Sequence, residues 1–452
     1  MLLLSKKIIN KHFIINFLFS FLIISFILGN PAVNLNVLLI IITSIFFFKK
    51  KIFQIELDYF DKILIILFLY IFLSGTVNSI IYYINGSEKS FLVFFKSIFF
   101  FRYIIFYFVI KFLIKENIIN FKIFFITAFS CVVFVSFDLI YQFIFGYDIF
   151  GYEAKAFHRR LAGPFGEEYI AGSYIQKFSL ISLFAIPIFF KFKKNYIKYI
   201  LTIFFIFLLL IALVLSGNRI PLVFFIFTVA GIIIFEKNLR KFLIPFLIIV
   251  FSIFFLTYNF NENYRQHMHS FTQKTIQILS PFSTNNILMP EEEEKYKDFQ
   301  FFTYEYKGQK YKITNSHLKE FKTGYVTWLD RKLFGGGIKS FKINCPKATK
   351  TLNCSSHPHN YYLEILANLG IFGFFIVLIL FFIAFIKTFV AKYFKDSNLN
   401  GFHLITPFVF LLFAEIFPIK STGSFFSTGN ATYVFLLLAI NMQLSKVKNY
   451  IE

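Results

Sequence analysis

Residues 357–364 (HPHNYYLE) carry more chemistry than any other short segment of the chain. They end a long polar stretch and lead into an apolar run, so they lie at a membrane surface if that run is a span. A histidine there can act as a general base near neutral pH, and Asn360 can either orient it or bind sugar hydroxyls. We expect His357, Asn360 and Tyr362 to bind substrate. Histidines at positions i and i+2 could instead hold a metal, but no Cys, His or carboxylate cluster accompanies them, so we expect no metal and no other cofactor.

Arginines stand at two other boundaries between polar and apolar sequence. Residues 158–165 (HRRLAGPF) precede one apolar run, and residues 216–221 (SGNRIP) form the turn between two others. Arginine binds phosphate through two parallel, charge-assisted hydrogen bonds. Arg219 would stand at the positive end of a helix, where a cation is unfavourable without an anion. We therefore expect Arg160, with Arg159 as an equal alternative, and Arg219 to bind a phosphate. The competing interpretation is arginines that anchor in lipid headgroups.

Weaker signals accompany these motifs. Lys420 begins a polar turn, residues 420–426 (KSTGSFF), and is a further candidate for a phosphate site. Residues 335–337 are consecutive glycines, but no strand and helix frame them as a phosphate-binding loop requires. The acidic run 291–294 is typical of a solvated surface turn rather than of a metal site.

Apolar runs dominate the chain and must position these motifs. Of 452 residues, 57% are hydrophobic and 74 are Phe. Apolar runs of about 20 residues between short charged loops predict an all-α polytopic membrane protein with about 12 transmembrane helices. The expected spans are 12–29, 31–48, 60–83, 91–114, 119–145, 171–190, 197–215, 219–236, 242–258, 361–386, 402–419 and 430–445.

Three parts follow from this division. Residues 1–258 hold the first nine helices, with an outer loop at 146–170. Residues 259–360 form one large periplasmic loop of mixed short elements, and residues 361–452 hold the last three helices.

Lysine-rich loops indicate the orientation in the membrane. Lys and Arg total 46 against 24 Asp and Glu, a formal net charge of +22. The excess concentrates in alternate short loops and near both ends of the chain, whereas residues 29–34 hold no Lys or Arg. By the positive-inside rule both termini and the lysine-rich loops face the cytoplasm, so the charge reflects topology rather than nucleic-acid binding. Segments 146–170, 216–219, 259–360 and 420–429 then lie outside, and they hold nearly all the motifs described above.

The cysteines fall into two groups. Cys131 lies within an apolar run and is expected to be a buried thiol. Cys345 and Cys354 share the large outer loop, and they can form a disulfide if that loop faces an oxidising compartment. Two unrelated free thiols are the alternative.

Taken together, these motifs resemble the O-antigen ligase/polymerase superfamily. The resemblance covers about residues 150–440. It consists of an Arg upstream of Gly-Pro-Phe, an Arg after Ser-Gly at an outer turn, a Gly-rich segment late in a large loop, and His-x-His-Asn-x-Tyr-Leu-Glu before Gly-x-x-Gly. The chain departs from the family at one point. Members often carry an Arg upstream of the Trp and Gly-rich segment, where this chain has His317, Lys319 and Lys322.

The resemblance implies an inverting, metal-independent glycosyltransferase in a bacterial inner (plasma) membrane. An acceptor hydroxyl would attack the anomeric carbon of an undecaprenyl-diphosphate-linked glycan. Arg160 and Arg219 would bind the diphosphate, and His359 would activate the acceptor. A ligase with a lipid A-core acceptor is slightly favoured, and a polymerase that uses the same donor and a glycan acceptor is the alternative. The expected partners are the donor, the acceptor and the lipid bilayer, but no nucleic acid.

Two further classes fit the sequence less well. A transporter or flippase would suit the many spans, but no repeated halves are evident, and few ionisable residues beyond Lys96, Arg102 and Asp138 fall deep in the apolar runs. A metal-dependent lipid-sugar transferase would carry acidic residues in the first outer loop, where residues 29–34 have none.

Overall fold

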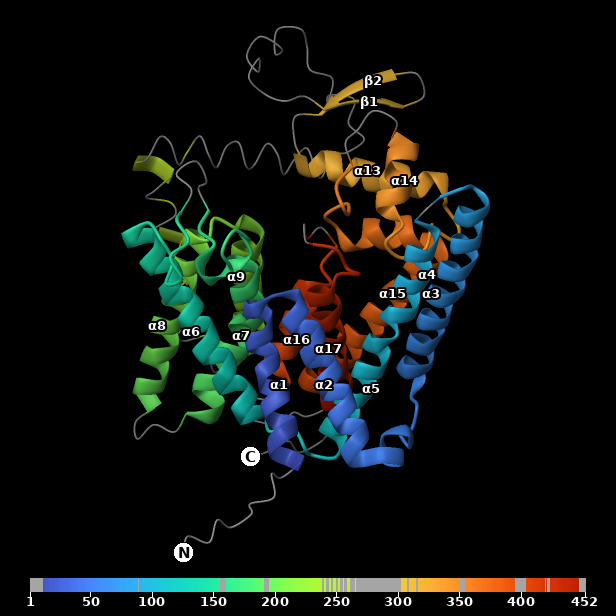
Figure 1. The fold of residues 1–452 in the computed structure, drawn as a ribbon. Helices are drawn as coiled ribbons and strands as arrows, with labels where there is room; N and C mark the ends of the chain where they lie inside the picture. Colours follow the sequence, from blue (N-terminus) through green and yellow to red (C-terminus); the bar gives the residue numbers. More distant parts are fainter. Residues whose placement is uncertain are drawn as a thin grey trace, which may run out of the picture.

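The structure is a computed structural model in which a helical bundle carries part of the large loop at one end (Figure 1). It describes residues 11–87, 89–154, 160–190, 195–237, 302–306, 309–313, 316–349, 354–394, 404–418, 420 and 423–446, together with scattered positions between 240 and 265.

The apolar runs form helices close to the predicted boundaries. In the described part of the chain, eight helical segments are long and apolar enough to span a membrane. They are α1 (Lys11–Leu28), α2 (Asn30–Phe48) continued by η1 (Lys49–Phe53), α3 (Tyr59–Ile84), α4 (Ser90–Phe100) joined to α5 (Arg102–Lys115), α6 (Phe121–Phe145), α7 (Ala171–Phe189), α8 (Asn195–Leu215) and α15 (Tyr361–Tyr393).

Shorter helices occupy three more of the predicted spans. They are α9 (Arg219–Phe235), α16 (Thr406–Glu415) and α17 (Thr428–Leu444). The predicted span 242–258 lies largely outside the described residues. The all-α polytopic class is therefore confirmed, whereas the number of about 12 spans stays a prediction.

The two ends of the bundle differ in chemistry. At one end, Asp58 Oδ2 lies 2.6 Å from Lys446 Nζ and 3.4 Å from Lys387 Nζ, so the segment just after α17 meets the start of α3 and the last part of α15. At the other end, the Gly429 amide donates to Asn30 Oδ1 at 3.1 Å, which joins the α1–α2 turn to the start of α17. We call this second end, which faces away from the start of α1, the outer end (Figure 1).

Short elements of the large loop lie over the outer end. Helices α13 (Ser316–Asp330) and α14 (Phe341–Thr349) lie there, above α15 and beside the upper end of α3 (Figure 1). Strands β1 (Phe302–Tyr306) and β2 (Gln309–Ile313) pair antiparallel, with Phe302 opposite Ile313 and Tyr306 opposite Gln309. In the other outer loop, η2 (Gly163–Phe165) forms one short turn ahead of α7.

Glycines join the large loop to α15. Helix α15 breaks at Gly370, where φ is 66°. The amides of Gly336 and Gly337 donate to the carbonyls of Ala367 and Asn368 at 3.2 and 2.8 Å, so loop backbone pairs with helix backbone. A Cβ on Gly370 would lie 2.2 Å from the Leu333 carbonyl oxygen, and only glycine allows so close an approach. The consecutive glycines therefore make a structural junction.

Candidate active site

Asn360 fixes the start of α15 and the turn that faces it. Its Oδ1 accepts from the Leu363 amide at 3.1 Å, which caps the helix. Its Nδ2 donates to the carbonyls of Pro418 and Lys420 at 2.7 and 3.3 Å. Both polar groups of this predicted substrate contact thus bond with protein atoms. These bonds tie residues 357–360, which we call the histidine segment, to the backbone of Lys420.

His357 and His359 lie together just before this cap. Their ring centroids are 4.3 Å apart, and His359 has φ 52°, an uncommon value for a residue with a side chain. Burial lowers the pKa of His357 to about 4, and the neighbouring His359 and Lys339 add to the shift because they disfavour a second positive charge. Burial also lowers the pKa of His359, and the Glu320 carboxylate opposes that shift. Both imidazoles are therefore neutral at pH 7, which is the form that a general base requires.

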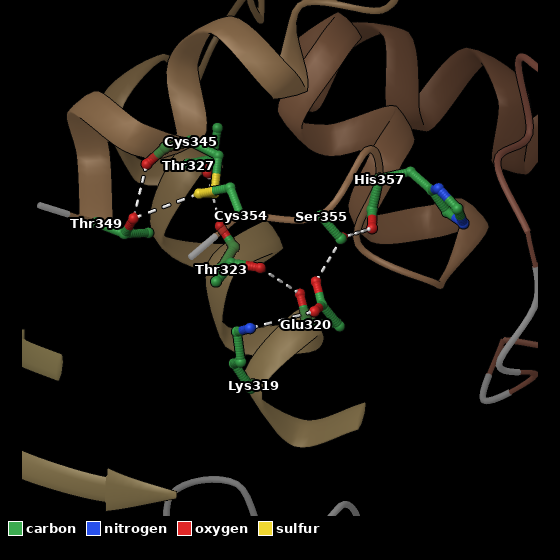
Figure 2. The surroundings of a disulfide bond; sticks show 9 residues. All are labelled: Lys319, Glu320, Thr323, Thr327, Cys345, Thr349, Cys354, Ser355 and His357. Atoms are coloured by element: carbon green, nitrogen blue, oxygen red, sulfur yellow. Dashed lines mark hydrogen bonds and ion pairs between the residues drawn. A yellow bond between two sulfur atoms is a disulfide. The ribbon is translucent and has the colours of Figure 1, made fainter. Parts of the chain in front are cut away.

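The histidine segment rests on α13 and on a disulfide (Figure 2). The Ser355 hydroxyl, which has one hydrogen to donate, lies 2.6 Å from Glu320 Oε2 and 2.5 Å from the carbonyl oxygen of His357. Cys345 of α14 is bonded to Cys354, the residue before Ser355, with the two Cα atoms 6.1 Å apart. The cysteines that the sequence suggests as a pair are thus joined in the structure, and they hold the histidine segment against α14.

The Arg219 turn packs on the start of α7. Helix α9 begins at Arg219, whose side chain is exposed. The Asn218 side chain donates to the Tyr169 carbonyl at 3.0 Å. A Cβ on Gly172 would come within 2.5 Å of Ser216 Oγ, so this helix and this turn are in direct contact. The loop ahead of α7 and the α8–α9 turn therefore form one surface at the outer end.

Arg160 is exposed in that same loop. The Gly163 amide donates to Gln142 Oε1 at 2.9 Å, which holds the segment after Arg160 against α6. Arg159 and His158 lie outside the described residues. Arg160, Arg219 and His359 belong to segments that lie at the outer end (Figure 1), and their grouping in one site stays a prediction.

Lys420 and Tyr362 both bond with groups at the end of α16. Lys420 Nζ donates to Glu415 Oε2 at 2.6 Å, and the Tyr361 hydroxyl donates to Glu415 Oε1, also at 2.6 Å. The Tyr362 hydroxyl donates to the Ile416 carbonyl. These contacts lock the first turn of α15 to α16, and they occupy the polar atoms of two residues expected to bind substrate.

A cavity of about 260 Å³ opens between these segments. The first turn of α9 lines it through Ile220 and Pro221, directly beside Arg219. Lys420 lines it from the turn that Asn360 holds, and Lys177 of α7 lines it from the side. The α1–α2 turn closes the cavity through Gly29 and Asn30. The structure thus brings Lys420 and the start of α9 to one cavity, whereas Arg160, Arg219 and His359 are not among the lining residues.

Two hydrogen-bonded lysines at the outer end, Lys177 and Lys339, are not predicted from the sequence as site residues. Lys177 Nζ donates to Asn430 Oδ1 at 2.6 Å, but in the sequence it is one lysine in an apolar helix. Lys339 Nζ donates to Ser424 Oγ at 2.7 Å, and Ser424 donates to the buried Glu364 at 2.6 Å. For the hydrogen bonds that join Lys339, Ser424 and Glu364, the sequence offers only the glycines at 335–337 as an indication.

A comparison with protein-family models matches residues 204–378 to the family described as O-antigen ligase. This match confirms the resemblance to the O-antigen ligase/polymerase superfamily. The matched segment runs from α8 to α15, so it includes Arg219 and the histidine segment, while Arg160 and Lys420 lie outside it. A search of curated proteins finds no match. The apolar helices are those of a multi-pass membrane protein, and the match supports glycan transfer of the O-antigen ligase/polymerase kind.

Proposed function

We propose that this protein transfers an undecaprenyl-diphosphate-linked glycan to an acceptor hydroxyl at the periplasmic face of the inner membrane. One observation carries the proposal. Asn360 ties the histidine-bearing start of α15 to the backbone of Lys420, and Lys420 shares a cavity with the first turn of α9, beside Arg219. A base and cationic groups thus lie at one end of a membrane bundle, which is the arrangement that transfer from a lipid diphosphate needs.

The chemistry assigns each group one task. His359 takes the proton of the acceptor hydroxyl as its oxygen bonds to the anomeric carbon. The bond from that carbon to the diphosphate oxygen breaks on the opposite face, so the configuration inverts and the diphosphate keeps the electron pair. Arg160 and Arg219 neutralise the charge that develops on the leaving group. No metal is required, because the guanidinium groups supply the positive charge.

Purified protein tests this assignment directly. With a lipid-diphosphate glycan and an acceptor, it should release undecaprenyl diphosphate without added metal. His359→Ala, Arg160→Ala and Arg219→Ala should each lower turnover about a hundredfold or more. His12→Ala, at the opposite end of the bundle, is the control and should retain activity. Normal turnover in all three variants, each shown to be folded, would refute the site assignment.

The acceptor is proposed to be lipid A-core, which makes the protein a ligase. A polymerase would use the same donor and differ only in the acceptor. The surface glycans of a deletion strain separate the two. A ligase deletion leaves core without any attached glycan, whereas a polymerase deletion leaves core that carries a single repeat.

A further inference from the structure

Two ammonium groups, those of Lys177 and Lys420, line the cavity, and the buried carboxylate of Glu415 is paired with Lys420. Lys177 Nζ bonds to Asn430 Oδ1 at 2.6 Å, and Lys420 Nζ bonds to Glu415 Oε2 at 2.6 Å and to Gln176 Oε1 at 3.4 Å. The charged groups that act on Lys177 are Glu415 and Lys420. Glu168 also lines the cavity, but its side chain is exposed at the rim.

The charges of Lys177, Lys420 and Glu415 do not balance. Lys177 and Lys420 contribute two positive charges and Glu415 contributes one negative charge, which leaves one positive charge in excess. Glu415 is paired closely with Lys420, so the uncompensated charge belongs to Lys177, whose oxygen partner is a neutral amide. A charge withdrawn from water without a counter-ion is unfavourable. An anion in the cavity would compensate it.

The rest of the cavity suits a phosphate group. The ring centroids of Tyr433 and Phe26 lie 5.1 and 5.8 Å from Lys177 Nζ, so two aromatic rings pack against the ammonium group and position it. The first turn of α9 faces the same space, and its Asn218 makes no side-chain cap bond to the helix. The positive end of that helix dipole adds to the attraction for an anion.

We propose that Lys177 binds the diphosphate of the lipid-linked donor, and that Lys420 serves chiefly to hold Glu415 and, through Tyr361, the start of α15. This inference rests on the proposed function. When the glycosidic bond breaks, the diphosphate oxygen keeps the electron pair and the leaving group gains one negative charge. Lys177 therefore binds the product more strongly than the donor, and its ammonium stabilises the transition state more than the ground state.

The test compares Lys177→Gln and Lys177→Arg with wild type in lipid nanodiscs of phosphatidylcholine. Lys177→Gln should lower kcat/KM about 10- to 100-fold, the range of one charge-assisted hydrogen bond, and should weaken binding of undecaprenyl diphosphate by a similar factor. Lys177→Arg should retain most of both. Lys392→Gln is the matched control, because Lys392 is a buried ammonium on α15 that is paired with Glu236 at 3.2 Å, and both properties should stay unchanged.

A phosphate could also come from a phospholipid headgroup, and a second arm separates the two sources. Phosphatidylglycerol is added to the nanodiscs while the binding of undecaprenyl diphosphate is measured. Little competition supports the donor. Strong competition in wild type that disappears in Lys177→Gln, together with unchanged kcat/KM, would overturn the proposal in favour of a lipid site.

The outcomes also separate this inference from the proposed function. If wild type releases no undecaprenyl diphosphate, the proposed function fails whatever Lys177 does. If wild type is active and folded Lys177→Gln matches it in kcat/KM and in product binding, the inference about Lys177 alone is wrong.

Discussion

His359, the base of the proposed transfer, has a pKa that opposing neighbours set. Burial lowers its pKa and the Glu320 carboxylate of α13 raises it, while His357 and Lys339 stand nearby as further charged or titratable groups. Removing the Glu320 charge should lower the pKa of His359 further. Because the base form persists to lower pH, the acid limb of kcat/KM should move to lower pH in Glu320→Gln. Rates measured between about pH 4.5 and 8 test this shift.

The exposed Glu116 provides the control for that experiment. It lies in the turn after α5, at the end of the bundle opposite the histidines, so Glu116→Gln should leave the pH profile unchanged. An acid limb of Glu320→Gln that stays in place or moves to higher pH would contradict the electrostatic role of Glu320. A uniform loss of rate at every pH would point instead to a purely structural role.

Residue types and spacing indicate some of the candidate site residues but not their contacts. The segment of His359 and Asn360 is evident from its polar residues at the edge of an apolar run. Lys177 is not evident, because its significance comes from Asn430, a residue 253 positions away. The sequence likewise cannot reveal that the Tyr362 hydroxyl donates to the Ile416 carbonyl. Contacts between distant segments exist only once the helices have packed.

At the scale of elements, the glycine junction between the loop and α15 predicts that a side chain at residue 370 will destabilise the protein. Gly370→Ala would place a methyl group 2.2 Å from the Leu333 carbonyl oxygen at a backbone φ of +66°. The backbone cannot yield there without breaking the bonds that join loop and helix. We expect a loss of about 3 kcal/mol or more, seen as a clearly lower Tm of the purified protein at a fixed scan rate.

Gly86 provides the matched control for this substitution. It has a similar φ of +70°, but no atom lies within 4 Å of the position of its Cβ. Gly86→Ala should therefore show only the cost of the left-handed conformation, about 1 kcal/mol. Equal Tm values for the two variants would mean that the close approach at Gly370 does not matter for stability.

Helix positions are more predictable than helix interruptions. A membrane span must be long and apolar to satisfy its backbone in lipid, so α1, α3 and α6 begin and end within two residues of the predicted limits. The break at Gly370 inside α15 is different. It depends on loop residues 335–337 meeting the helix backbone, and the sequence shows the glycines without showing that they meet.

At the scale of the whole molecule, charge and topology agree. Lysines from the ends of α5, α15 and α17 converge near Asp58: Lys111, Lys387 and Lys446 lie within 3.8, 3.4 and 2.6 Å of its Oδ2. Three of the lysine-rich segments that the positive-inside rule places on one side thus meet at one end of the bundle. The motif-bearing segments meet at the other. The side of the membrane that each end faces remains a prediction from charge.

Labelling of single cysteines tests that orientation. In a chain with Cys131→Ser and the Cys345–Cys354 disulfide intact, Asn85→Cys places an exposed thiol in the α3–α4 turn at the outer end, and Lys50→Cys places one in η1 at the lysine-rich end. A membrane-impermeant maleimide should label Asn85→Cys in intact spheroplasts and Lys50→Cys only after permeabilisation, because loops rich in Lys and Arg stay in the cytoplasm. The reverse pattern would place the histidine segment in the cytoplasm. There it could not meet a donor presented at the periplasmic face, and the proposed transfer would have to be abandoned.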